Sequence, residues 1–273
     1  MTPDAVARAF RWACATELRA LKPGNVHVYR DGHGMTVAQF RRSARAAAPW
    51  LAQPGLTVGA RILAATLATR AAVGINTNLG IVLLAAPLCQ AAMASGRGDL
   101  RDRLKRTLAR LTVADARLAY AAIAHASPAG LGTSRRADVR DRPRVTLLNA
   151  MRLAAGRDRV ARQYAAAFAD IFDLGVAQLE AARRTGVPIE AAATTLHMTF
   201  LRRFPDSHVA RKFGRATAAA LRREAKAVPD TQRALLQFDR SLKRRGLNPG
   251  TTADLVVASL LAYRLTSIVP PAA

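Results

Sequence analysis

Five short polar segments interrupt a chain that is otherwise rich in alanine and other apolar residues, and they are the places where chemistry is to be expected. In each of them polar residues are more closely spaced than turn formation alone requires. In chain order they span residues 17–35, 76–80, 130–164, 205–214 and 248–254.

The first segment contains the sequence Lys22-Pro23-Gly24-Asn25. Proline and glycine form a rigid turn, in which the lysine and the asparagine would present a cation and an amide to a phosphate or a base. An ordinary connection between two helices is the alternative interpretation of this segment.

The second segment places Asn76 and Asn78 at the entry to a predicted buried helix, within the stretch 71–96 that contains no charged residue. Buried amides need hydrogen-bond partners, because each offers donors and an acceptor. These two could satisfy backbone groups at a helix end, or they could contact a purine edge or ribose hydroxyls. The sequence leaves both interpretations open.

The third segment begins with Gly130 and Gly132, which would let the backbone approach a ligand closely, although such a pair is a weak signal. Asp158 and Arg162 follow, four residues apart on one helix face. That spacing usually forms a surface ion pair that contributes little.

The fourth segment places Asp206 and Ser207 at a predicted helix start, with Arg211 and Lys212 one turn later. Helix amino termini favour phosphates, and the two cations would strengthen that preference. Asp206 would either cap the helix or hold Mg²⁺ against a polyphosphate.

The fifth segment contains Thr251 and Asp254 at the spacing of a capping box, which is its structural interpretation. The alternative is functional. A carboxylate from Asp254 and an amide from Asn248, both beside a helix start, would suit a cation or a ribose.

The elements that must position these segments are helices. Apolar residues recur at three- and four-residue steps, and no alternating run of β-forming residues occurs. The clearest helical runs are 38–50, 58–73, 81–94, 147–155 and 189–201. Because proline and glycine separate these runs, we expect an all-α fold, with residues 1–273 forming a single domain. About ten to twelve helices would make up a bundle or an orthogonal array.

The composition agrees with this prediction and excludes several classes of protein. Apolar residues make up 51% of the 273 residues and aromatic residues only 5%, which suits helix-on-helix packing and is too apolar for a disordered chain. Two cysteines, Cys14 and Cys89, exclude a disulfide scaffold. Polar residues interrupt the uncharged stretch 71–96, so we expect a buried helix there and a soluble, cytoplasmic protein.

Basic residues outnumber acidic residues by 42 to 18, which gives a net charge of +24. Such a charge attracts nucleic acid, anionic membranes or phosphorylated ligands. Nearly all of the basic residues are arginine, however, and an arginine-rich, lysine-poor chain is also typical of a GC-rich coding sequence. The charge alone therefore does not decide the function.

Taken together and in this order, the segments resemble the triphosphoribosyl-dephospho-CoA synthase family. The motif in which an asparagine follows the Lys-Pro-Gly turn is similar to the motif of the family branch found in archaea and one-carbon-metabolising bacteria. The motifs that carry the resemblance span nearly the whole chain: Lys22-Pro23-Gly24, Asn76-Thr77-Asn78-Leu79-Gly80, Gly130-Leu131-Gly132, Arg162-Gln163-Tyr164, Pro205-Asp206-Ser207-His208 and Asn248-Pro249-Gly250.

The resemblance implies an all-helical transferase. In the implied reaction, the ribose 2′-hydroxyl of 3′-dephospho-CoA attacks C1′ of ATP, adenine leaves, and the triphosphate stays on the product, a prosthetic-group precursor. Displacing a base from C1′ builds oxocarbenium character, which a carboxylate stabilises, and the hydroxyl needs a general base.

Residue roles follow from the same resemblance. The implied catalytic carboxylates are Glu17, Asp115 and Asp158, and the implied ligands of Mg²⁺, bound together with ATP, are Asp206 and Asp254. The implied nucleotide and phosphate contacts are Lys22, Asn25, Asn76, Asn78, Arg211, Lys212 and Asn248.

Two other functions stay open. Residues 32–36 depart from the family pattern, because they are shorter and lack the two aspartates that flank the methionine, here Met35. The chain could thus be a related ATP-using enzyme that serves another acceptor in methanopterin- or methanofuran-type C1 cofactor biosynthesis. An Arg-rich helical nucleic-acid-binding protein is the third interpretation, although no aromatic residues are interleaved with the basic ones. We therefore expect ATP and dephospho-CoA or another small acceptor as partners, with no membrane or nucleic acid, and homodimer formation stays open.

Overall fold

The computed structural model of the chain describes residues 1–126 and 139–268, and these fold into helices without a β-sheet. The described ranges contain α1 Pro3–Arg19, α2 Val37–Ala52, α3 Val58–Val73, α4 Leu79–Met93, α5 Leu100–Ala109, α6 Val113–Ala126, α7 Leu147–Ala154, α8 Arg159–Ala165, the π-helix η1 Asp170–Val176, α9 Ala177–Arg184, α10 Ile189–Arg203, α11 Ser207–Phe213, α12 Arg215–Ala227, α13 Gln232–Arg244 and α14 Gly250–Thr266.

The all-α prediction is confirmed, although the described residues form fourteen α-helices and not ten to twelve. The extra helices are short pieces where a helical sequence pattern is broken. At Gly214, for example, a φ of 92° ends α11 and starts α12. Only glycine adopts such a conformation without strain, so the chain turns there.

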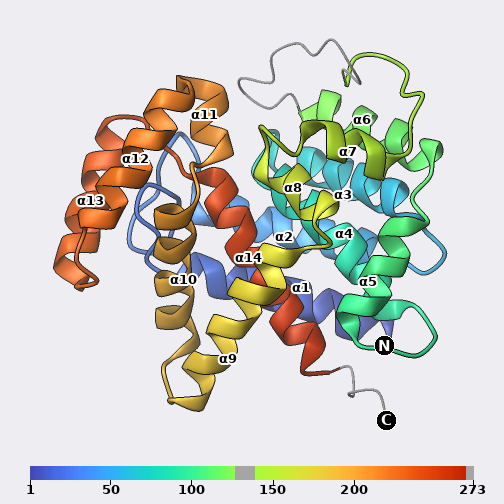
Figure 1. Cartoon of the computed structure of the whole chain (residues 1–273), viewed down its shortest axis with the longest axis horizontal. Coiled ribbons are helices and arrows are strands. Elements are labelled where there is room, and N and C mark those ends of the chain that lie inside the picture. The colour runs from blue at the N-terminus through green and yellow to red at the C-terminus, as the bar shows by residue number, and fades with distance from the viewer. Residues whose placement is uncertain (127–138, 269–273) are drawn as a thin grey trace.

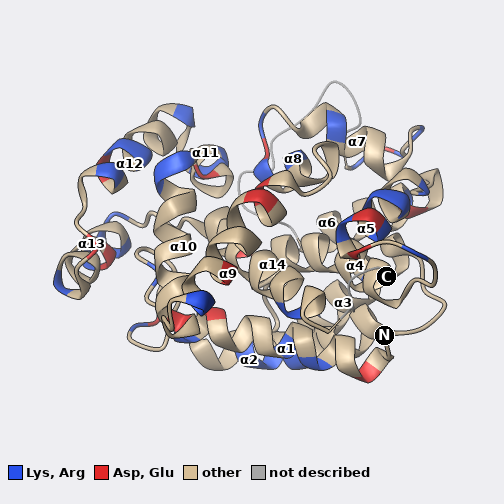
Figure 2. Ribbon diagram, turned by 60° about the horizontal axis from the view of Figure 1, so that its bottom comes forward, with Lys and Arg blue, Asp and Glu red and all other residues tan. Residues whose placement is uncertain are grey.

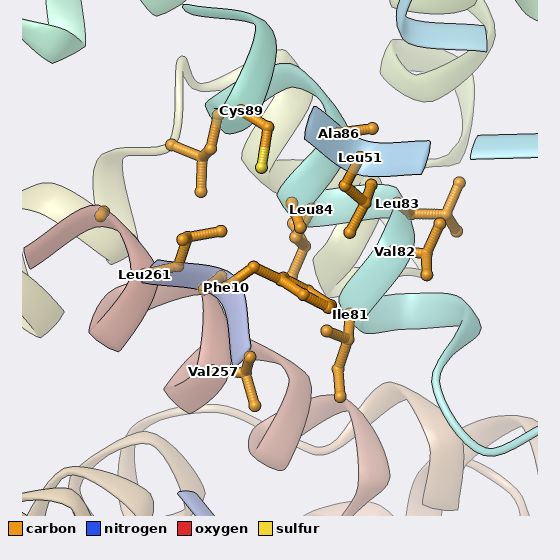
Figure 3. Close-up of a cluster of buried hydrophobic side chains, with 14 of the residues drawn as sticks. Phe10, Leu51, Ile81, Val82, Leu83, Leu84, Ala86, Cys89, Val257 and Leu261 are labelled. Carbon is orange, nitrogen blue, oxygen red and sulfur yellow. The ribbon is translucent and has the colours of Figure 1, made fainter. Parts of the chain in front are cut away.

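The main hydrophobic core forms around α14, which packs against α1, α4, η1 and α10 (Figure 1). Side chains from three helices distant in sequence meet there, among them Phe10 of α1, Leu84 of α4 and Val257 of α14 (Figure 3). α4 and α14 are apolar nearly all round, as expected for helices in the centre of a helical protein.

The prediction of a buried helix in the uncharged stretch 71–96 is confirmed by α4. Most of its residues are buried, and it is entered through the polar turn at 74–78. None of the helices in the described ranges is long and apolar enough to cross a membrane.

A second, smaller hydrophobic cluster is formed by residues of α10, α11, α12 and α13, which lie together on one side of the molecule (Figure 1). Leu21, from the turn after α1, belongs to this cluster, whereas its neighbour Ala20 belongs to the main core. The Lys-Pro-Gly turn therefore lies where the two cores meet.

Candidate active site

A cleft with a volume of about 690 Å³ brings the five polar segments together. Of the twelve residues predicted for the site, eight line it: Glu17, Asn25, Asn76, Asn78, Asp158, Arg211, Asn248 and Asp254. Lys22, Asp115, Asp206 and Lys212 do not line it. Gly130 and Gly132 lie outside the described residues.

Two long helices, α4 and α14, begin at the cleft, and neither is capped by the side chain of its own N-cap residue, Asn78 or Pro249. Asn76 Oδ1 accepts a hydrogen bond of 3.1 Å from the N–H of Leu79, whereas Asn78 Nδ2 is buried without a partner among the described residues. Helix amino termini carry partial positive charge, so two of them opening on one cleft favour an anionic ligand there.

The predicted capping box of Thr251 and Asp254 is wrong, because α14 begins at Gly250 and places Thr251 inside its first turn. The cap comes instead from a different helix. Asp206 Oδ2 accepts hydrogen bonds of 2.8 Å from both the N–H and the hydroxyl of Thr252.

Asp206 also caps its own helix α11, because its Oδ1 accepts a 2.9 Å hydrogen bond from the N–H of Val209. One buried carboxylate thus holds the starts of two helices. The placement of Asp206 fits this capping role and leaves Asp254 as the predicted metal ligand that lines the cleft.

The Asp254 carboxylate makes no hydrogen bond or ion pair within the described ranges, and it lies against Gly80 at the start of α4. A Cβ at position 80 would overlap this carboxylate, so only glycine permits the contact. Burial raises the pKa of Asp254 well above its usual range. The negative charge of Asp206 adds to the rise and Arg211 opposes it.

A chain of buried polar groups connects α1 to α14. Lys22 forms an ion pair with Glu17 and donates a 3.1 Å hydrogen bond to Asn25 Oδ1. Asn25 Nδ2 in turn donates to Asn248 Oδ1 at 2.7 Å. Lys22 is fully buried, so its charge serves Glu17 and not a ligand in the cleft.

The Glu17 carboxyl lines the cleft although the residue is only 3% exposed. Burial raises the pKa of Glu17, and the ion pair with Lys22 opposes that rise. Burial likewise lowers the pKa of Lys22. A carboxylate with a raised pKa is suited to accept a proton near neutral pH.

Asp158 pairs with Arg211 of α11, and not with Arg162, as the spacing on its own helix had suggested. Its other oxygen accepts a 3.1 Å hydrogen bond from the N–H of Ala161 and so caps α8. Asp158 therefore fixes Arg211, whose guanidinium group lines the cleft.

Asp115 lies away from the cleft and has a structural role in α6. It accepts hydrogen bonds of 2.8 Å from the N–H of Gly59 and of 2.9 Å from that of Thr112, and it forms a capping box with Thr112. Burial raises its pKa, but these hydrogen bonds outweigh burial and lower it. Lys212 is exposed, with its Nζ 5.2 Å from the ring centre of Phe213.

The sequence patterns missed two polar residues. Asp239 Oδ1 accepts a 2.9 Å hydrogen bond from the N–H of Gly24 and lies 3.2 Å from His27 Nε2 and 3.0 Å from Lys243 Nζ. It therefore holds the Lys-Pro-Gly turn from α13. The signal for it is an acidic residue on the apolar face of α13, beside Leu242.

His208 is the second residue that was not predicted. Its ring lies against Gly250 in the wall of the cleft. Burial lowers the pKa of His208, and the charge of Asp206 opposes this. A neutral imidazole is thus available in the cleft at physiological pH.

Part of the cleft lining is apolar, and α6 and α7 contribute much of it. This part includes Phe40, Ile123, Leu147 and Met151. The cleft therefore combines a polar end with helix amino termini and an apolar wall, the combination expected for an amphipathic, phosphorylated ligand.

No group of three or more histidine, cysteine or acidic residues suitable for a metal ion occurs within residues 1–126 and 139–268. A metal site whose ligands all come from protein side chains is therefore not found in these ranges. Mg²⁺ bound to a nucleotide, however, needs only one or two carboxylates besides phosphate oxygens and water. The single carboxylate of Asp254 fits that requirement.

Comparison with known proteins identifies a family and a similar solved structure. The family ATP:dephospho-CoA triphosphoribosyl transferase matches residues 3–270. A crystal structure from Archaeoglobus fulgidus, of a protein assigned as a triphosphoribosyl-dephospho-CoA synthase, is similar in fold, with a TM-score of 0.67 and 23% sequence identity. The similarity covers 81% of this chain and 96% of that chain. No curated protein matches the sequence.

Proposed function

The chain belongs to the ATP:dephospho-CoA triphosphoribosyl transferase family, and on this premise we propose that the cleft is where ATP and the acceptor react. Enzymes of this family transfer the 5-triphosphoribosyl group of ATP to dephospho-CoA. A bond forms between the ribose 2′-oxygen of dephospho-CoA and C1′ of ATP, and the bond from C1′ to adenine breaks. One proton passes from the 2′-hydroxyl of dephospho-CoA to the departing adenine. The observation that carries the proposal is the convergence of five distant polar segments on one cleft.

The triphosphate binds at the polar end of the cleft, where α4 and α14 begin. The N–H groups of Leu79 and Thr252 are already bound by Asn76 and Asp206. The other N–H groups of the two first turns, together with the Asn78 amide, form no side-chain hydrogen bond in the described ranges and supply donors there. Arg211 adds a positive charge that Asp158 fixes in place. Pre-positioned donors and cations of this kind stabilise a polyphosphate without reorganisation during the reaction.

Asp254 is the residue that would hold Mg²⁺. Its pKa is raised by burial and by the charge of Asp206, so a cation beside it would relieve an unfavourable negative charge. Mg²⁺ would neutralise part of the triphosphate charge. Asp206 is not assigned to the metal, because both of its oxygens accept hydrogen bonds from helix starts.

Glu17 acts as the general base in this proposal, because it lines the cleft and its pKa is raised by burial. Its ion pair with Lys22 orients the carboxylate and limits that rise. The acceptor, dephospho-CoA, lies so that its 2′-hydroxyl approaches Glu17. The apolar wall formed by α6 and α7 suits the uncharged parts of the two substrates.

Adenine release tests the proposal. The enzyme is incubated with ATP, Mg²⁺ and dephospho-CoA, and free adenine is measured by chromatography for the wild type, Arg211→Gln and Asp254→Asn. Both variants should release adenine at least about 100-fold more slowly, since each removes one charged contact to the triphosphate or its metal. The matched control, Arg183→Gln/Arg184→Gln on the exposed face of α9, should keep the wild-type rate.

Wild-type rates in both cleft variants would overturn the assignment of the cleft. Adenine release that occurs only with a methanopterin- or methanofuran-type precursor would instead change the acceptor and keep the cleft. The two failures are therefore distinguishable.

A further inference from the structure

A second cavity, of about 390 Å³, lies at the opposite end of α4 from the cleft. It is lined by Gln90 near the end of α4, by the loop that follows, and by one face of α5. No residue lines both cavities. From Asn78 to Gln90 the helix advances about 18 Å, at about 1.5 Å per residue, so the two cavities are separate.

Four arginines surround this cavity, which we call the arginine pocket. Arg103 and Arg106 lie on one face of α5, whose basic residues are blue in Figure 2, Arg110 follows as the C-cap of that helix, and Arg97 comes from the loop. No acidic residue of the described ranges lines the pocket.

Two of the four arginines build the pocket wall. Arg103 donates hydrogen bonds of 3.0 Å to the carbonyl of Gly98 and of 3.1 Å to that of Ala94. Arg106 donates at 2.5 Å to the carbonyl of Arg97. These bonds hold the loop against α5 and fix the positions of two guanidinium groups.

Three further polar groups of the pocket have no side-chain partner in the described part of the chain. The side chains of Arg97 and Arg110 are exposed and form neither hydrogen bond nor ion pair, and Oε1 of Gln90 is buried without a hydrogen bond. The acidic residues nearest in sequence have other contacts, since Asp99 caps α5 and the carboxylate of Asp102 lies 3.5 Å from Lys105 Nζ.

We propose that the arginine pocket binds a small polyphosphate anion, either inorganic or carried by a nucleotide. Four guanidinium groups around one cavity repel one another, and a multivalent anion would remove that repulsion. The guanidinium fork matches phosphate oxygens in a bidentate geometry, which a lysine cannot do. The Gln90 amide would accept a hydrogen bond from a protonated phosphate, or donate one after rotation of its terminal bond.

Inorganic triphosphate is the probe for this site, measured by isothermal titration calorimetry at low salt. To separate the pocket from the cleft, the titration is done in the Arg211→Gln background, in which the cleft contact is removed. Binding should persist in that background and should become about tenfold weaker or more when Arg97→Gln/Arg110→Gln is added. Both changed side chains are exposed and make no contact that folding requires.

The matched control adds Arg183→Gln/Arg184→Gln to the same background, because this pair removes the same charge from an exposed face of α9. Its affinity for triphosphate should stay within twofold of the background. An equal loss in the control would overturn the proposal, since it would show a general effect of net charge. Unchanged binding after Arg97→Gln/Arg110→Gln would also overturn it.

Two further titrations identify the source of the anion. Equal affinity for inorganic triphosphate and ATP would indicate recognition of phosphate alone, whereas tighter binding of ATP would indicate a nucleotide, and both agree with the proposal. A duplex oligonucleotide that binds far more tightly than triphosphate, and loses affinity in the same variant, would overturn the small-anion proposal in favour of a nucleic-acid surface. These tests do not depend on the proposed function of the cleft.

Discussion

The hydroxyl of Tyr164 donates a hydrogen bond of 2.6 Å to the carbonyl of Leu83, the acceptor that Pro87 leaves unpaired inside α4. In an α-helix the N–H of residue 87 would bond to the carbonyl of residue 83, and proline has no N–H. Tyr164 is fully buried, and burial raises its pKa. Tyr164, one of the residues of the family resemblance, thus has a structural explanation, because with Pro87 it allows α8 to pack on α4 beside the cleft.

Tyr164→Phe should destabilise the protein by about 1–3 kcal/mol, because the carbonyl of Leu83 would be buried without a donor. Urea denaturation followed by circular dichroism measures the change. Tyr29→Phe is the control, since Tyr29 is 58% exposed, and it should cost less than about 0.5 kcal/mol. Equal stability of both variants would contradict the role assigned to the hydroxyl.

Asp206→Ala should destabilise the protein by about 2 kcal/mol or more, because it removes the caps of α11 and α14 together and leaves the N–H of Thr252 buried without an acceptor. Thermal unfolding compares it with Asp99→Ala, which removes the cap of α5 alone and should cost about 1 kcal/mol. A smaller effect at Asp206 than at Asp99 would show that it does not cap two helices.

Asp254→Asn should stabilise the free protein while it slows adenine release. The folded-state pKa of Asp254 is raised by burial, so the native state holds its proton more tightly than the unfolded chain does. Stability therefore falls as pH rises from about 3.9 through the raised pKa, and the variant removes this loss. Melting temperatures measured at pH 4 to 8 should diverge in favour of the variant as pH rises. A variant that is less stable than the wild type at pH 8 would disagree with this account.

Asp239→Asn should weaken the hold of α13 on the Lys-Pro-Gly turn. Burial raises the pKa of Asp239, but hydrogen bonds from His27 and Gly24 outweigh it, so the folded-state pKa is lowered. The stability that this carboxylate contributes is present above about pH 3.9 and is lost as pH falls through the lowered pKa. We expect the variant to be about 3 kcal/mol less stable at pH 7 and nearly equal to the wild type in acid. A difference that does not change with pH would exclude the charge of Asp239 as its cause.

Glu17→Gln should lower kcat by about 10²–10⁴-fold, the usual contribution of a general base, with a small effect on the KM for ATP. Steady-state adenine release measures both constants. Because the variant leaves Lys22 buried without its ion pair, Glu17→Gln/Lys22→Met is the control for folding. The double variant should recover the melting temperature and not kcat. Recovery of kcat in the double variant would show that Glu17 serves only to pair Lys22.

The sequence by itself determined the fold class, the burial of α4 and the five polar segments. Helix periodicity and caps such as Thr112 with Asp115 depend on residues within four positions of each other, so spacing alone reveals them. The apolar character of α4 likewise depends on composition over a short window.

Only the tertiary structure decided which polar residues face the cleft. Asp206 and Asp254 were equivalent candidates in the sequence, but Asp206 is used by Thr252, 46 residues away, whereas Asp254 meets Gly80 and is left without a partner in the described ranges. Asp239 was overlooked because its partner Gly24 is 215 residues distant. The pKa of a carboxylate and its hydrogen-bond partners depend on burial and on groups that packing brings together. These groups are distant in the chain, so their contacts cannot be read from the spacing of residues in the sequence.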